Sequence, residues 1–347
     1  MPQVLPTCNR WLMAHHFTNL QNSYPPFKPD GKTAFFCHSS YEPRALASIR
    51  SSDRCHGIDY SFVFHSNDYL GSEAYRENHG KIVEHLGSVS TNTPVEVPVD
   101  CENRDDLIHS YRDSIRKTLQ QVDDIALDMS TFTRGRMICL LDLIIREKGD
   151  KPLYLFYSEP EKYATEQAEN NTAWMTKGAK NIVSVPGFGG DRQTEKKKLL
   201  VLLLGHDAER AVSVVETVDP DMIVVVSQGT LKHRKKLQEV FLRINANILK
   251  KYGPRIATIL TAPPRGWEAV YDVFGRIHGM YCNQYNITAC LDGTKMQVVG
   301  AVAFCQKHPG IELLYMEPEK YNCASYTEGI GNTWWLEVPD MNMFKKK

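Results

Sequence analysis

Short apolar runs alternate along most of the chain with longer stretches in which apolar residues recur every three or four positions. The short runs predict buried strands, and the longer pattern predicts amphipathic helices. In the stretch 232–250, for example, Leu237, Phe241, Ile244 and Ile248 fall on one face and basic residues on the other. This alternation is typical of βαβ units built around a parallel sheet.

The strand-like runs form two sets of five. The first set is 34–37, 62–64, 95–99, 125–127 and 153–156, and the second is 199–204, 222–226, 256–260, 287–289 and 311–314. Helical patterns separate consecutive runs in both sets. We therefore predict an α/β fold with five strands in each half of the chain.

A seven-residue motif, Tyr-x-Glu-Pro-Glu-Lys-Tyr, occurs at Tyr157–Tyr163 and again at Tyr315–Tyr321, 158 positions later, with six of seven residues identical. Each copy follows the last strand-like run of its set. Thr-x-Gly-x-x-Asn follows each copy, at 176–181 and at 327–332, and a Val-Pro pair comes after that. A repeat at a domain-sized interval indicates internal duplication.

The duplication divides the chain into two tandem Rossmann-like parallel-sheet units. We place unit one at 30–190 and unit two at 196–341, with an N-terminal arm at 1–29. The segment 187–198, which contains three glycines and a run of lysines, is expected to be the linker between the units.

The repeated motif itself has two interpretations. Its paired glutamates, Glu159 and Glu161 in the first copy, are carboxylates of the kind that bind metal, but no His or Asp ligand lies near them in sequence. A structural role is favoured, in which the motif attaches the last strand of each unit to its neighbour or builds an interface between the units. The tyrosine rings would supply the buried area.

Composition excludes several function classes. The 41 basic residues balance 41 acidic ones, so no global field draws the 347-residue chain to a membrane, and contact with nucleic acid, although open, is not indicated. Nine cysteines without a CxxC pair argue against a disulfide framework or zinc ribbon. We expect a cytoplasmic protein that has no membrane-spanning segment and binds no metal. We also expect no cofactor, because the sequence lacks the glycine fingerprint of dinucleotide-binding sites and the Walker phosphate-binding loop.

Ligands of an open parallel sheet gather at the carboxyl ends of its strands. In unit two, the fourth strand-like run is followed by Asp292, Gly293, Thr294 and Lys295 and then by an apolar helix. Glycine allows close backbone approach, and the helix N-terminus, the hydroxyl and the ammonium all favour an anion. The alternative is that Thr294 only caps the helix and Lys295 is a solvated surface residue.

The first strand of each unit ends in a loop with histidine, an acidic residue and arginine. These residues are His38, Glu42 and Arg44 in unit one and His206, Asp207, Glu209 and Arg210 in unit two. The arginines can fork onto phosphate, and the histidines can donate to a base or carry a proton. The alternative is a Glu-Arg ion pair that pins the loop to the next helix.

These strand-loop-helix segments resemble the CARF domain, the CRISPR-associated Rossmann fold that senses cyclic oligoadenylates. A Gly-Thr-Lys-type loop lines the nucleotide pocket of that family. The resemblance implies ligand contacts from Asp292, Gly293, Thr294 and Lys295, and a degenerate counterpart in unit one with Thr133, Arg134 and Arg136. No HEPN or restriction-type nuclease signature accompanies the two units.

Unit two is expected to hold the main pocket, between 205–210 and 292–295, because Phe132 would fill the corresponding space in unit one. A secondary or interface site is expected in unit one. Its residues are His38, Arg44, Thr133, Arg134 and Arg136.

The function expected from these features is a cytoplasmic sensor or regulatory subunit that binds a nucleotide-type ligand, such as a cyclic oligonucleotide, and signals to a partner protein or within a homodimer in antiviral defence. One alternative is a metal-independent phosphodiesterase or ring nuclease in which Lys295, Thr294 and His206 polarise a phosphate. Another is a structural subunit of a larger complex. A non-catalytic role is favoured, and no catalytic residue is assigned.

Overall fold

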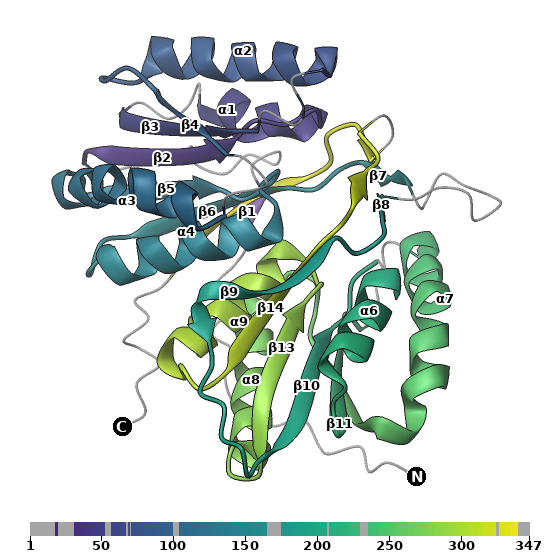
Figure 1. Cartoon of the computed structure of the whole chain (residues 1–347). Helices are drawn as coiled ribbons and strands as arrows, with labels where there is room; N and C mark the ends of the chain where they lie inside the picture. The colour runs from purple at the N-terminus through teal and green to yellow at the C-terminus, as the bar shows by residue number, and fades with distance from the viewer. Residues whose placement is uncertain are drawn as a thin grey trace.

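Over the described residues, the computed structural model contains two large β-sheets, each covered by helices, and two small two-stranded sheets (Figure 1). The strand orders of the small sheets are β15-β8 and β16-β7. The strand orders of the two large sheets are β1-β17-β6-β5-β2-β3-β4 and β12-β11-β10-β13-β14-β9. The structure describes residues 18–19, 31–52, 57–66, 69, 71–99, 104–164, 175–206, 208–229, 235–323 and 326–338.

The first unit contains the five predicted strands, all parallel. They are β2 (Thr33–His38), β3 (Ile58–His65), β4 (Val95–Pro98), β5 (Asp124–Asp128) and β6 (Leu153–Ser158). Its helices are η1 (Pro43–Leu46), α1 (Ala47–Ser52), α2 (Glu73–Val89), α3 (Arg104–Gln121) and α4 (Arg134–Glu147).

The second unit repeats this plan, with strands β10 (Lys197–Leu203), β11 (Met222–Ser227), β12 (Ile256–Thr261), β13 (Tyr285–Leu291) and β14 (Glu312–Glu317). Its helices are α6 (Ala208–Val218), α7 (Lys235–Tyr252), η3 (Gly253–Arg255), α8 (Trp267–Tyr281) and α9 (Lys295–Lys307). In both sheets the first strand is central, the second and third lie on one side of it, and the fourth and fifth on the other. The predicted pair of Rossmann-like units is thus confirmed.

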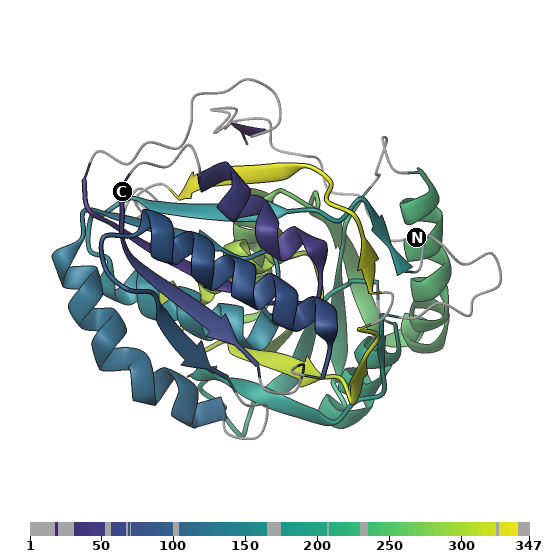
Figure 2. The same cartoon turned by 90° about the horizontal axis from the view of Figure 1, so that it is seen from above.

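The units exchange their last strands. The segment after β6 continues to β9 (Asn181–Gly189), which pairs antiparallel with β14 of the second unit. Reciprocally, β17 (Thr333–Val338) pairs antiparallel with β6 of the first unit. The yellow β17 segment can be followed from the lower unit into the upper one in Figure 1 and beside the purple helix in Figure 2. Each sheet therefore contains one strand from the other sequence range: β9, within 30–190, belongs to the second sheet, and β17, within 196–341, belongs to the first.

Short strands between these elements are exchanged in the same way. β7 (Lys162–Tyr163) pairs with β16 (Thr327–Glu328), and β8 (Thr176–Lys177) pairs with β15 (Lys320–Tyr321). Each pair joins the motif of one unit to the Thr-x-Gly-x-x-Asn segment of the other. The predicted N-terminal arm contributes β1 (Thr18–Asn19), which pairs with β17; the rest of 1–29 lies outside the described residues.

The exchange explains two repeated glycines. Gly178 and Gly329 both have φ of +67°, a left-handed conformation that favours glycine. A Cβ on Gly178 would approach Glu319, and one on Gly329 would approach Glu161, each within 2.6 Å. Each glycine thus packs on the motif of the other unit, which supports the interface role of the motif.

The linker predicted at 187–198 is wrong at both ends. β9 extends to Gly189 and β10 begins at Lys197, so only 190–196 connects the two strands. One of the three glycines reflects close packing on β14, because a Cβ on Gly190 would lie 3.0 Å from the backbone nitrogen of Glu312. Local composition does not distinguish such an edge strand from a loop.

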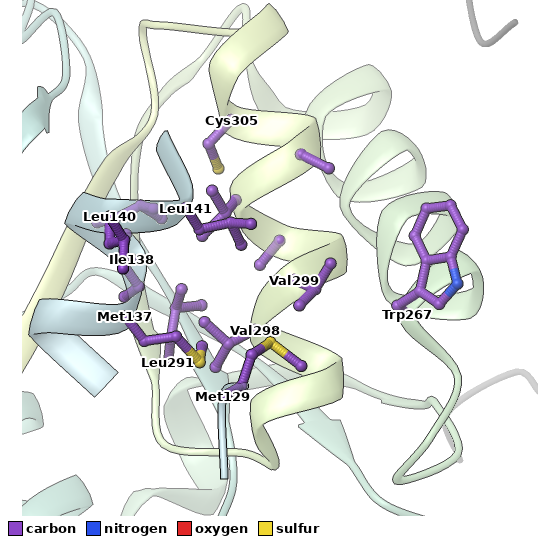
Figure 3. Packing of buried hydrophobic residues seen from close by; sticks show 14 of the residues in the cluster. Met129, Met137, Ile138, Leu140, Leu141, Trp267, Leu291, Val298, Val299 and Cys305 are labelled. Atoms are coloured by element: carbon purple, nitrogen blue, oxygen red, sulfur yellow. The ribbon is translucent and has the colours of Figure 1, made fainter. Parts of the chain in front are cut away.

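The core continues from one unit into the other through α4 and α9, which pack together. Figure 3 shows Met137, Ile138 and Leu141 of α4 on the side of α9 where Val298 lies, all buried. The two units therefore share apolar surface that neither buries alone. None of the helices in the described part of the chain has the length and apolar character of a membrane span.

Candidate functional site

The carboxyl ends of strands from both sheets open into one pocket of about 120 Å³, a space for several water molecules. Loops after β2, β5, β10 and β13 form much of its wall. The predicted residues that line it are His38, Arg44, Thr133, Arg134, His206, Arg210, Asp292, Gly293, Thr294 and Lys295. The residues expected to form a main and a secondary site therefore lie around a single space.

Two predicted residues fall elsewhere. Asp207 lies outside the described residues. Arg136 lines a second, apolar pocket beneath Phe132, and its guanidinium donates to the Val99 carbonyl oxygen at 3.5 Å. Phe132 is buried and borders both pockets, so it lines the shared space and does not close off a separate pocket in unit one.

The first residues of helices α4 and α9 are basic, and each contacts the other unit. Thr133 and Thr294 are the N-caps of these helices, so Arg134 and Lys295 occupy equivalent positions. Arg134 Nε donates to the Gly293 carbonyl oxygen at 3.0 Å. Lys295 Nζ donates to the Ser130 carbonyl oxygen of unit one. Each helix N-terminus thus supports the strand-end turn of the other unit.

Lys295 is not the solvated lysine of the alternative interpretation. Its side chain is half-buried in the pocket wall, and burial together with the Arg44 and Arg134 charges lowers the pKa of Lys295 well below its ordinary value. The carboxylates of Glu42 and Asp128 oppose this shift only in part. An anion would stabilise the ammonium form and would be attracted by it.

Thr294 does cap α9, as the same alternative proposed. Its hydroxyl accepts from the Gln297 N–H at 3.2 Å and donates to the Pro264 carbonyl oxygen. The Gln297 side chain accepts from the Thr294 N–H at 2.9 Å and completes a capping box. The cap holds Gly293 and Lys295 in place at the helix start.

A buried ion pair fixes the turn after β13. Asp292 Oδ1 lies 2.9 Å from Arg210 Nη2 and 3.4 Å from Arg134 Nη1, and the side chains of Asp292 and Arg210 are less than a tenth exposed. Gly205 leaves room for this turn, because a Cβ there would lie 1.9 Å from the Asp292 carbonyl oxygen. Arg210 therefore orients Asp292 between the ends of β10 and β13.

In unit one, the Glu-Arg pair that was an alternative for the first loop is present. Arg44 Nε and Nη2 donate to the two Glu42 carboxylate oxygens at 2.8 and 3.1 Å, and Nη1 donates to the Ser158 carbonyl oxygen at 3.1 Å. Burial opposes the charge, but Glu42 outweighs it and raises the pKa of Arg44. In unit two, Arg210 pairs with Asp292 instead.

His38, which also lines the pocket, is uncharged, unlike the arginines around it. Its ring is buried and packs against the Phe132 ring with a centroid distance of 5.1 Å. Burial and the Arg136 charge lower the pKa of His38 well below its ordinary value, so the ring is neutral and offers one donor and one acceptor. Its equivalent, His206, stacks on the Tyr163 ring at 6.1 Å.

Sequence reasoning missed the tyrosine wall of the pocket. Seven described tyrosines line it: Tyr41, Tyr69, Tyr157, Tyr163, Tyr315, Tyr321 and Tyr326. Neighbouring rings, such as Tyr41 and Tyr69, lie 5.3 Å apart. The signal was the repeated motif, whose two copies begin and end with the four tyrosines 157, 163, 315 and 321. Within the described residues, no cluster of three His, Cys, Asp or Glu side chains is arranged to hold a metal ion.

Comparison with known proteins gives a likeness of fold. No protein-family model and no curated protein matches this sequence. Among solved structures, a type III CRISPR defence DNA nuclease activated by cyclic oligoadenylate is similar over 86% of this chain and 68% of its own, with a TM-score of 0.50 and 8% identity. The cytoplasmic domain of a prokaryotic cation chloride cotransporter matches 84% of this chain and 99% of its own, with a TM-score of 0.25 and 10% identity. The first likeness covers most of this chain and therefore extends across both units.

Proposed function

We propose that this chain is a sensor or regulatory protein whose central pocket binds a nucleotide-type ligand, with a cyclic oligonucleotide as the favoured candidate. The observation that carries the proposal is that two helix N-termini converge on one pocket. The first residue of each helix is basic, Arg134 in α4 and Lys295 in α9. Helix N-termini and basic side chains attract phosphate.

The remaining wall fits the rest of a nucleotide. Tyrosine faces stack on bases without requiring a particular sequence. The neutral His38 ring lines the pocket and offers a donor and an acceptor that can meet a base edge. Because equivalent residues of both units surround the pocket, a ligand with its own repeated units would meet similar partners on each side.

The likeness to a nuclease activated by cyclic oligoadenylate supports the same class of ligand and a role in antiviral defence. Tyr163 and Tyr321 lie on the exchanged strands, and both line the pocket. A ligand that contacts them would favour one arrangement of the two units. We propose that this arrangement is what a protein partner or a second copy of the chain recognises.

Lys295→Ala is expected to weaken binding of cyclic tetra-adenylate by at least about tenfold, because one charge-assisted contact contributes roughly 1.5–3 kcal/mol. The unliganded melting temperature should change little, because loss of the hydrogen bond to the Ser130 carbonyl oxygen is offset by relief of the repulsion from Arg44 and Arg134. Thermal shift with cyclic tetra-adenylate, linear oligoadenylate, ATP and inorganic phosphate measures both quantities.

Lys250→Ala, an exposed lysine in the last turn of α7, is the matched control and should bind as the unmodified chain does. A melting temperature that no nucleotide raises would leave the structural-subunit alternative as the better account. Equal binding by Lys295→Ala and Lys250→Ala would remove the helix N-termini from the proposed site.

A further inference from the structure

An apolar pocket of about 80 Å³ lies beside the central pocket, and the proposed function does not use it. Helix α4 lines it with Cys139, Leu140 and Leu143, and the exchanged strand β9 lines it with Val183 and Val185. Because β9 pairs in the sheet of the second unit, the space lies between the two units. Neither unit forms it alone.

Aromatic side chains border both the apolar pocket and the central pocket. Phe132, Tyr315 and Tyr321 line the two spaces, and the Tyr315 and Tyr321 hydroxyls are 3.3 Å apart. A Cβ on Gly135 would lie 2.8 Å from Tyr315 Cδ1, so the glycine lets this ring pack directly on α4. The spaces are neighbours with a shared aromatic wall, but the α4 and β9 side chains named above line the apolar pocket and not the central one.

Apolar space of this size is uncommon inside a protein. Interiors pack as densely as organic crystals, and unfilled apolar cavities are destabilising because the atoms that line them lose contacts. Leu140, Leu143 and Val185 are buried and line this pocket, so an apolar group that entered it would be removed from water. A cavity of about 150 Å³ holds benzene, so this one has room for roughly three or four carbon atoms.

Two charged side chains line the pocket within the described residues, Arg136 and Glu317. Glu317 is buried, and its carboxylate accepts from Asn181 Nδ2 at 3.3 Å. Arg136 and Cys139 are partly exposed, so they mark the end that opens to solvent. The Arg136 charge adds to burial in lowering the pKa of His38, so its field extends beyond the pocket. A guanidinium beside apolar space matches a carboxylate on an apolar body.

We propose that the apolar pocket is a second ligand site, which binds a small carboxylate that carries a short alkyl chain. The chain lies between α4 and β9, in contact with Leu140 and Val185, and the carboxylate accepts from the Arg136 guanidinium. The proposal goes beyond the nucleotide-type ligand and does not depend on it. A molecule bound here would pack on the same aromatic wall that borders the central pocket.

The first test is protection of Cys139 in the full chain by hexanoate, with alkylation by N-ethylmaleimide followed by peptide mass spectrometry. Cys139 lines the pocket, whereas Cys282, which is also partly exposed, follows α8 and does not line it. Hexanoate at roughly ten times its Kd should slow alkylation of Cys139 by about tenfold, because only the unoccupied fraction reacts. The rate at Cys282 should not change. Hexanol and hexylammonium, which have the same chain without the carboxylate, should bind at least about tenfold more weakly.

Saturation-transfer NMR of hexanoate measures the same binding without relying on the reactivity of Cys139. Arg136→Gln should raise the Kd by at least about tenfold, and Arg136→Lys, which keeps the charge, should retain most of the affinity. Arg146→Gln, an exposed arginine on the same helix, is the matched control and should bind as the original chain does. Cys139→Trp, which fills the pocket, should abolish the transfer, and Cys282→Trp should not. Circular dichroism confirms that each variant is folded.

Several results would overturn the second site. An unchanged alkylation rate at Cys139 with no saturation transfer would show that hexanoate does not bind, and transfer that persists in folded Cys139→Trp would place it elsewhere. Stronger binding of hexylammonium would assign the dominant charge to Glu317 and exclude a carboxylate. Equal affinity of Arg136→Gln and Arg146→Gln would exclude the contact with Arg136. Thermal shift with cyclic tetra-adenylate is a separate measurement, so none of these results counts against the proposed function.

Discussion

Asp292→Ala is expected to lower the free energy of unfolding by about 3–5 kcal/mol, the range for removing one partner of a buried ion pair. Arg210, whose side chain is 7% exposed, would lose the carboxylate 2.9 Å away. Arg134 would lose the same carboxylate at 3.4 Å. Urea unfolding of the variant and the original chain measures the difference.

Arg255→Ala is the control for this prediction. Arg255 pairs with Asp219 at 2.8 Å, but both side chains are about half exposed or more, at 47% and 73%. Exposed pairs contribute about 0–1 kcal/mol. If Asp292→Ala and Arg255→Ala had equal effects, the buried pair would not be what fixes the turn after β13.

Gly205→Ala is expected to lower the free energy of unfolding by roughly 3 kcal/mol or more and to abolish ligand binding. The added methyl would lie 1.9 Å from the Asp292 carbonyl oxygen, a backbone atom that moves only if the ends of β10 and β13 separate. Overpacking against side chains costs about 1–3 kcal/mol, and a backbone contact is less easily relieved. Urea unfolding and thermal shift with cyclic tetra-adenylate measure the two effects.

Gly279→Ala provides the opposite case. Gly279 lies within α8, and a Cβ there meets nothing within 4 Å. Alanine in an open helical position should raise stability by up to about 1 kcal/mol. A Gly205→Ala variant as stable as Gly279→Ala would mean that the strand ends accommodate the methyl and that glycine is not required at the pocket.

The fold could be predicted because its signals are local. Each of the ten parallel strands coincides with a short apolar run, and helix patterns separate them. The Tyr-x-Glu-Pro-Glu-Lys-Tyr motif revealed the duplication. Thr294 was recognisable as a cap because a capping residue and its helix are adjacent in sequence.

The exchange of β9 and β17 could not be predicted in the same way. Both units carry the same motif and the same following segment, so the sequence is equally compatible with pairing inside a unit and pairing across units. The exchange and the packing of α4 on α9 also bring the strand ends of the two units around one pocket. From the sequence alone, each unit was expected to hold its own site, and nothing indicated that Lys295 contacts Ser130 of unit one.

The most direct test of the single shared pocket is the stoichiometry of cyclic tetra-adenylate binding, measured by isothermal titration calorimetry. Residues of both units line the same space, so we expect one binding event per chain, weakened by Arg134→Ala from unit one and by Lys295→Ala from unit two alike. Two independent events per chain, each sensitive to only one of these substitutions, would contradict the account.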